Sequence, residues 1–158
     1  MTESKGKLRI IYKNDLENDM KVVILAGGKG TRLRPLTNDT PKPLLLINGR
    51  PFIQHLIEHL RSAGFKHILL LVGPYRTYFE SALGTGAQFG VEIKYFSESK
   101  QSGTGTAIAR ARDHLEQNFL LLNGDTLFEF DIVDFVQRPI EGSCLVRIAL
   151  VKLENSAR

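Results

Sequence analysis

The chain has little that is typical of a secreted, membrane-spanning or disulfide-linked protein. It contains no tryptophan and one cysteine, Cys144. A single cysteine excludes a disulfide within the chain, and the apolar and β-branched neighbours in 143–150 predict a buried structural thiol rather than a nucleophile. The longest apolar runs, 68–72 and 119–122, are far shorter than the roughly 18 residues of a membrane span. The N-terminus carries charges throughout and no apolar core of the kind found in signal peptides, so we expect a soluble, cytoplasmic protein without a membrane partner.

The length also limits the organisation of the chain. With 158 residues, of which 42% are hydrophobic, it can form one domain with a real core but not two. Residues 1–19 are polar and balanced in charge, and only 8–12 are apolar enough for an additional strand. We expect 1–19 to be an N-terminal extension, either an appended edge element or an extension from an upstream start.

Positive charge is concentrated in one segment. The chain has 21 Lys and Arg against 17 Asp and Glu, and residues 21–50 alone contain six basic residues and one acidic residue. A protein that binds nucleic acid more often spreads basic residues along a face or helix, with aromatic side chains for stacking. We therefore expect a small anionic ligand and no nucleic acid.

A glycine-rich loop occupies this basic segment, directly after an apolar stretch, 21–26, that predicts a strand. Gly27, Gly28 and Gly30 allow the backbone to turn sharply and to present N–H groups to a ligand. The basic residues around the turn are Lys29, Arg32, Arg34 and Lys42. Backbone donors surrounded by cations are typical of a loop that holds a polyphosphate.

Strand and helix patterns alternate along the rest of the chain. Further strands are predicted at 68–72, 91–96, 119–122 and 143–153, and helices at 51–63, 75–83, 104–115 and 131–136. This alternation predicts an α/β fold with a mainly parallel sheet that is covered on both faces. Ligands of such sheets bind beyond the carboxyl ends of the strands, and the glycine loop leaves the first strand at that end.

Three other motif interpretations fail on spacing or position. The loop 28–33 lacks the third glycine of the dinucleotide fingerprint, and no acidic residue ends the second strand. It is not a P-loop, because a glycine follows the lysine. His55, Glu58 and His59 match the H-x-x-E-H pattern of zinc proteases, but they lie away from the apolar stripe of their helix. We expect a solvated helix face there.

Two further segments complete a candidate site. Residues 97–107 open a helix after the third strand, where Gly103 allows a flat ring to approach and Gln101 and Thr104 offer hydrogen bonds; a simple N-cap is the alternative. Asp125 follows the fourth strand next to a glycine. Beside a phosphate loop it is better explained as a ligand of Mg²⁺ than as a turn residue, because phosphate-bound Mg²⁺ usually takes only one or two protein carboxylates.

Together these segments resemble the nucleoside-diphosphate-sugar pyrophosphorylases, also called sugar-1-phosphate nucleotidyltransferases. Residues 25–37 with 41–45 look like the family signature, and segments similar to 47–52, 103–107 and 123–125 recur in the same order. The runs 103–107 and 119–130 look most like the guanylyltransferases for mannose 1-phosphate and heptose 1-phosphate. The resemblance implies a Rossmann-like, three-layer (GT-A-like) fold. It also implies an enzyme that joins a sugar 1-phosphate to a nucleoside triphosphate, giving an NDP-sugar and pyrophosphate, with Mg²⁺ as cofactor.

The resemblance also implies roles for individual residues. Arg32 and Lys42 would act on phosphates as catalytic residues, and Asp125 would bind Mg²⁺. The implied nucleotide-binding residues are Leu25, Ala26, Gly27, Gly28, Gly30, Thr31, Gln101, Gly103 and Thr104. The residue before Gly103 is commonly Leu in the guanylyltransferases and is Ser102 here, so neither the base nor the sugar is assigned.

Catalytic domains of this family continue beyond the point that corresponds to residue 158. We therefore expect 20–158 to be the N-terminal, nucleotide-binding part of a domain truncated at its C-terminus, as a fragment, a split gene product or a crystallised portion. An open sheet edge and exposed apolar surface would favour a homo-oligomer. The alternative function is a non-catalytic nucleotide-sensing or regulatory module, or an inactive fragment of the same fold.

Overall fold

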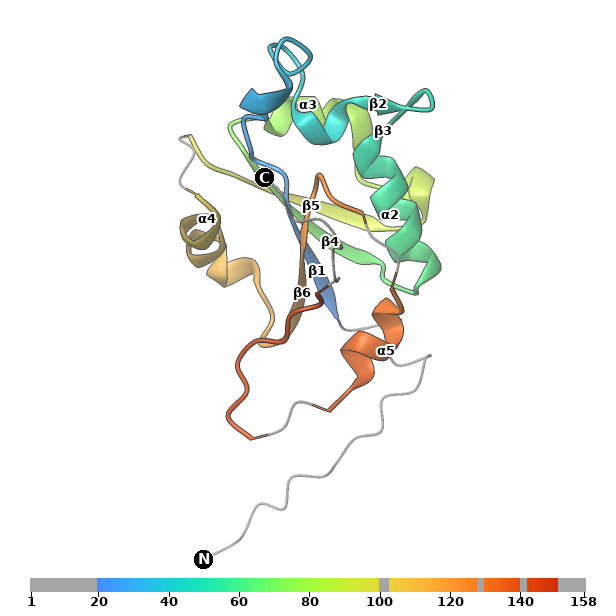
Figure 1. Ribbon diagram of the computed structural model, residues 1–158, viewed down its shortest axis with the longest axis vertical. Helices are drawn as coiled ribbons and strands as arrows, with labels where there is room; N and C mark the ends of the chain where they lie inside the picture. The colour runs from blue at the N-terminus through green and yellow to red at the C-terminus, as the bar shows by residue number, and fades with distance from the viewer. Residues whose placement is uncertain (1–19, 100–102, 128–129, 140–141, 151–158) are drawn as a thin grey trace, which may run out of the picture.

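A computed structural model of the chain describes residues 20–99, 103–127, 130–139 and 142–150. Its centre is a parallel sheet of four strands in the order β5-β4-β1-β6 (Figure 1). The strands are β1 (Lys21–Leu25), β4 (His67–Gly73), β5 (Glu92–Ser97) and β6 (Phe119–Asn123). β1 and β4 read as continuous apolar runs because the sheet buries them on both faces. No helix within the described ranges is both long and apolar enough to cross a membrane.

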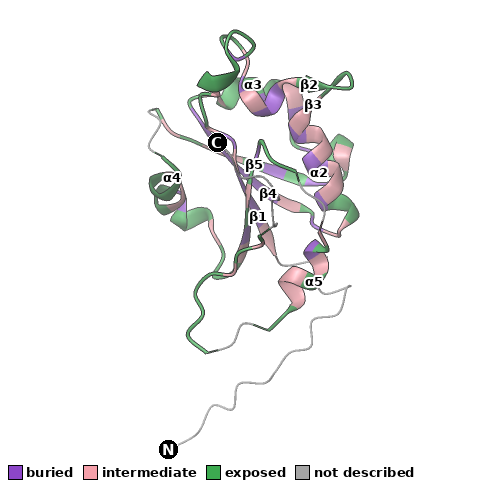
Figure 2. Ribbon diagram, viewed as in Figure 1, coloured by how far each residue is buried: buried purple, intermediate pink, exposed green. Residues whose placement is uncertain are grey.

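Helices cover the two faces of the sheet, which gives three layers (Figures 1 and 2). Three helices, α2 (Phe52–Ser62), α3 (Arg76–Leu83) and α5 (Ile132–Gln137), pack on the face that carries Val22 and Ile24. α4 (Thr104–Arg110) covers the opposite face, where Ala107 and Ile108 contact the cluster around Val23 and Leu69. The predicted α/β fold with a mainly parallel sheet is therefore confirmed.

Most of the predicted elements appear close to their expected positions. The strands predicted at 21–26, 68–72, 91–96 and 119–122 correspond to β1, β4, β5 and β6, and the helices predicted at 51–63, 75–83 and 131–136 to α2, α3 and α5. The helix predicted at 104–115 is shorter, since α4 ends at Arg110 and a 3₁₀ turn, η4 (Arg112–His114), follows. Three more 3₁₀ turns are η1 (Thr31–Leu33), η2 (Lys42–Leu44) and η3 (Ala87–Phe89).

A small hairpin of β2 (Leu46–Ile47) and β3 (Arg50–Pro51) precedes α2. Its turn is Asn48-Gly49, both with positive φ, which is the pairing that tight hairpins favour. His55 and Glu58 of the H-x-x-E-H pattern contact this hairpin, through the carbonyl of Ile47 and the guanidinium of Arg50. The helix face is therefore half-buried rather than solvated as predicted. The described residues include no group of three or more His, Cys, Asp or Glu side chains that could hold a metal ion.

The strand predicted at 143–153 is wrong for its described part, because 144–150 form no strand. An alternating apolar pattern gives a strand only where a neighbouring strand supplies hydrogen bonds, and no described strand pairs with this segment. Instead, the Arg147 guanidinium donates to the carbonyls of Phe135 and Arg138, both at 2.8 Å. Leu145 and Leu150 are left 95% and 87% exposed. Residues 151–153 and the possible strand at 8–12 lie outside the described residues.

The predicted burial of Cys144 is also wrong. This free cysteine is exposed. Its burial was inferred from the same alternating pattern. Alternate residues face the core only if the segment forms a strand of the sheet, and this segment does not.

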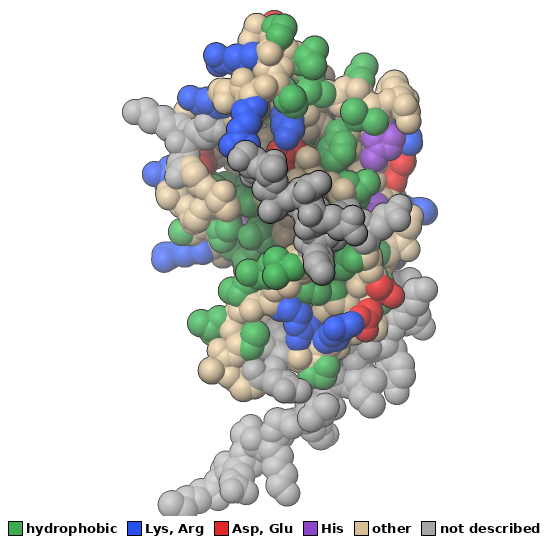
Figure 3. All heavy atoms as spheres, viewed as in Figure 1, with side chains coloured by type: hydrophobic (Ala, Val, Ile, Leu, Met, Phe, Trp, Pro, Cys, Tyr) green, Lys and Arg blue, Asp and Glu red, His purple; other side chains and the backbone are tan. Residues whose placement is uncertain are grey.

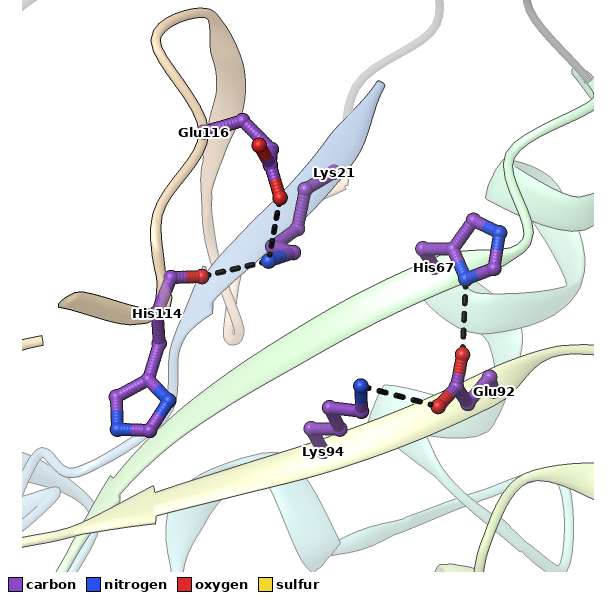
Figure 4. A network of polar contacts seen from close by, with 6 residues as sticks. All are labelled: Lys21, His67, Glu92, Lys94, His114 and Glu116. Atoms are coloured by element: carbon purple, nitrogen blue, oxygen red, sulfur yellow. Dashed lines mark hydrogen bonds and ion pairs between the residues drawn. The ribbon is translucent and has the colours of Figure 1, made fainter. Parts of the chain in front are cut away.

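Polar side chains join the strands near their amino ends, opposite the ends that carry the glycine loop (Figure 4). The Lys21 ammonium at the start of β1 donates to Glu116 at 3.1 Å. The carboxylate of Glu92 lies 3.0 Å from the His67 ring and 3.3 Å from the Lys94 ammonium. These partners, His67 first, hold the pKa of Glu92 below its usual value. Of these contacts, the one between His67 and Glu92 joins two strands, β4 and β5.

Candidate functional site

A cleft of about 420 Å³ lies over the carboxyl ends of the four parallel strands. This volume is in the range of small-molecule sites, and the position is the one expected for ligands of open α/β sheets. Eleven of the twelve predicted site residues line the cleft: Leu25, Ala26, Gly27, Gly28, Gly30, Thr31, Arg32, Lys42, Gly103, Thr104 and Asp125. Gln101 lies outside the described residues. The structure thus brings distant segments together, while the role of each residue stays a prediction.

The floor of the cleft is a close approach of two backbones. Gly27 follows β1 and Gly73 ends β4, and a Cβ added at Gly27 would lie 2.9 Å from the Gly73 backbone nitrogen. Gly73 itself has φ +55. Ala26 N–H donates to the Leu71 carbonyl at 2.9 Å, so the hydrogen bonds between β1 and β4 continue up to the residue before Gly27. Only glycine at position 27 lets the loop leave the sheet this close to β4.

Replacing Gly27 with alanine should destabilise the domain by about 1–3 kcal/mol, the cost of forcing an extra carbon against fixed backbone. Gly28 is the matched control, because a Cβ there meets nothing within 4 Å. We expect Gly28→Ala to leave the free energy of unfolding unchanged or to raise it slightly. Urea unfolding of the two variants measures the difference, and equal stability would show that the contact at Gly27 relaxes freely.

The basic loop is held in place by Gly30 and Thr37. Gly30 has φ +59, and a Cβ there would lie 3.1 Å from the Cβ of Lys42. The buried Thr37 hydroxyl donates to the Gly30 carbonyl at 2.8 Å. This packing places η1, which carries Arg32, next to η2, which carries Lys42. Figure 3 shows Lys and Arg side chains gathered at the upper end of this face, around the loop that follows β1.

Lys42 and Asp125 meet in the cleft, although they are 83 residues apart in the chain. The Lys42 ammonium donates to Asp125 Oδ2 at 2.7 Å, and both side chains are partly exposed. Asp125 reaches this position because Gly124 N–H donates to the Leu25 carbonyl at 2.8 Å, which ties the end of β6 to the end of β1. The hydrogen bond from Lys42 is the largest cause that holds the pKa of Asp125 below its usual value. At neutral pH the carboxylate is therefore ionised and able to bind a hard cation.

Several residues that line the cleft were not among the predicted site residues, Glu98 and Phe96 among them. Glu98 follows β5, and its side chain is only 6% exposed and pairs with Arg110 at 3.0 Å. Its position two residues beyond the strand predicted at 91–96 was the available signal. That signal was weak, because a glutamate after a strand is ordinarily solvated.

Residues 21–158 match the family of nucleotidyl transferases. The chain belongs to this family. It is 35% identical over 137 residues to mannose-1-phosphate guanylyltransferase of Mycobacterium tuberculosis, covering 86% of this chain and 38% of that protein. It is also 35% identical over 122 residues to UTP–glucose-1-phosphate uridylyltransferase AglF of Haloferax volcanii, covering 77% of this chain and 50% of that protein.

A solved structure shows the same fold. The crystal structure of HddC from Yersinia pseudotuberculosis complexed with GMP-PN matches with a TM-score of 0.68 and 35% identity, covering 75% of this chain and 53% of that one. The chain thus spans about half or less of the length of these three proteins. The resemblance to sugar-1-phosphate nucleotidyltransferases, including guanylyltransferases, is confirmed.

Proposed function

We propose that the chain forms the nucleotide-binding part of a sugar-1-phosphate nucleotidyltransferase, which joins a sugar 1-phosphate to a nucleoside triphosphate and releases pyrophosphate. The observation that carries this proposal is the meeting of Lys42 and Asp125 at 2.7 Å in the cleft beside the glycine loop. A cation, an ionised carboxylate and backbone donors are the groups that a metal-bound triphosphate requires. Family membership and the names of the relatives support the same reaction.

Asp125 is the residue that would hold Mg²⁺. Among the described residues it offers one carboxylate rather than a full ligand set, which fits a metal that is bound mainly through substrate phosphates and water. When bound, Mg²⁺ neutralises part of the phosphate charge. In this structure Lys42 and Asp125 neutralise one another, so a nucleotide and its cation would separate them, with Lys42 moving to a phosphate.

The side chains of the protein would then contribute to the reaction by stabilising negative charge on the phosphates. An oxygen of the sugar phosphate forms a bond to the α-phosphorus in line, while the bond from that phosphorus to the bridging oxygen breaks and pyrophosphate leaves with the electron pair. The nucleophile is already an anion, so no base has to remove a proton. Arg32 and Lys42 counter the charge that accumulates on the phosphates.

The test is release of pyrophosphate from a panel of nucleoside triphosphates and sugar 1-phosphates. The panel is run with the chain alone and with a longer form that supplies the part present in its relatives. Sugar-dependent release supports the proposal. Nucleotide binding without release by either form would favour the non-catalytic, regulatory alternative. A cytoplasmic location and a homo-oligomeric state stay predictions.

A further inference from the structure

Thr37 is the one residue with a buried polar side chain in the part of the chain that the structure describes, and it is 8% exposed. It is not among the residues that line the cleft. A buried hydroxyl needs a hydrogen-bond partner, and that of Thr37 donates to the Gly30 carbonyl in the glycine loop. The methyl group packs on the same residue, since a Cβ added at Gly30 would lie 3.0 Å from Thr37 Cγ2. Both branches of the Thr37 side chain therefore contact one residue of the loop.

The turn that carries Arg32 begins at the same carbonyl. The Gly30 carbonyl accepts the Leu33 N–H at 2.9 Å, which is the first hydrogen bond of η1, together with the Thr37 hydroxyl. All residues of 31–36 are exposed, so burial in the core does not fix this turn. Its shape depends on its own hydrogen bonds, and Thr37 supplies a bond that joins the two ends of the segment 30–37.

Lys42, the other cation of the cleft, is held by additional contacts. The prolines on either side of it in the chain are both buried, and their rings restrict the backbone there. The Lys42 ammonium also pairs with Asp125 at 2.7 Å. Of the two cations, Arg32 is thus the one whose position depends more on the Thr37 hydroxyl.

A cation stabilises developing charge only if it is already in place when the charge develops. A displacement of about 1 Å at a reacting centre can cost roughly a hundredfold in rate. Arg32 lines the cleft from an exposed turn, which Thr37 closes from its buried side. We propose, on the basis of the function proposed above, that Thr37 is a positioning residue for Arg32. It acts through the Gly30 carbonyl, without touching the substrate.

The test begins with Thr37→Val, which keeps the β-branched shape and removes the donor. In a form of the protein that releases pyrophosphate, kcat should fall about tenfold, while KM for the nucleotide stays within about threefold. Thr37→Ser keeps the hydroxyl and should retain most of kcat. Ser62→Ala is the matched control, because the Ser62 hydroxyl also donates to a backbone carbonyl at 2.8 Å, that of Glu58 in α2, away from the cleft. This control should keep the wild-type kcat.

Double variants separate positioning of Arg32 from a general structural role. In the Arg32→Ala background there is no guanidinium left to position, so Thr37→Val should lower kcat further by less than about twofold. In the Lys42→Ala background the same substitution should keep its effect of about tenfold. A partly unfolded variant would lose activity to the same extent in both backgrounds.

Amide hydrogen exchange of the chain, followed by NMR, reports on the turn without any turnover. The Leu33 amide donates to the Gly30 carbonyl and should exchange severalfold faster in Thr37→Val than in the wild type. The Leu44 amide of η2, which donates to the Pro41 carbonyl at 2.8 Å, is the internal reference and should keep its rate.

Three results would overturn the inference while sugar-dependent release by the wild type leaves the proposed function intact. They are an unchanged kcat in Thr37→Val, a raised KM with kcat unchanged, and equal effects of Thr37→Val in the two single-variant backgrounds. If no form of the protein releases pyrophosphate, the proposed function itself fails and the inference fails with it, whatever the exchange rates.

Discussion

Replacing Lys42 with alanine should lower kcat by roughly a hundredfold or more in a form of the protein that releases pyrophosphate. The expected size is that of one lost group that stabilises charge developing in the transition state. Arg32→Ala should have an effect of the same order, because Arg32 lines the same cleft. The measurement is steady-state pyrophosphate release at saturating nucleotide and sugar 1-phosphate.

Lys29 provides the control for this prediction. It lies in the same glycine loop and is exposed, but it is not among the residues that line the cleft. Lys29→Ala should therefore change kcat much less than Lys42→Ala. Equal and small losses at all three positions would mean that the cations only attract the substrate, and the catalytic assignment would then be wrong.

The second large effect is expected at Asp125. Asp125→Asn keeps the shape of the side chain but removes its charge, so release of pyrophosphate that depends on Mg²⁺ should fall by about a hundredfold or more. The fold should survive, since an exposed ion pair such as the one with Lys42 contributes at most about 1 kcal/mol. The measurements are a Mg²⁺ titration of activity and the thermal unfolding midpoint.

Asp113→Asn is the matched control for the loss of a negative charge. Asp113 is 84% exposed and pairs with Arg112, its neighbour in the chain. This variant should keep wild-type activity and Mg²⁺ dependence. Wild-type Mg²⁺ dependence in Asp125→Asn would contradict the metal assignment and leave Lys42 as the main reason for the position of that carboxylate.

The sequence predicted the strands and the glycine loop because their signals are local. Residues 21–26 are apolar throughout, and glycines follow where the chain must turn. The sequence placed Lys42 and Asp125 in the same site but did not predict their direct contact. That contact depends on β6 lying next to β1. The pair of Glu98 and Arg110 was missed for a similar reason, because it joins a strand end to a helix on one face of the sheet.

The one strand that was predicted wrongly shows the limit of a periodic pattern. Residues 144–150 alternate as a strand would, but a strand also needs a neighbour to pair with. The pattern contains no information about that neighbour. The expected burial of Cys144 failed with it, whereas the helix α2, whose apolar stripe packs on an existing sheet, was predicted closely.

The position of β1 between β4 and β6 has a consequence for how the protein is made. β1 is the first described strand to leave the ribosome, but its partner β6 ends at Asn123, about a hundred residues later. β4, the other partner of β1, ends at Gly73 and emerges about halfway through this interval. At a synthesis rate of about 5–20 residues per second, the edge of β1 that pairs with β6 stays open for roughly 5–20 seconds. During this interval the unpaired edge of β1 is accessible to other nascent chains and to chaperones. The strand that begins the binding site therefore has one edge open to wrong pairing until β6 is made.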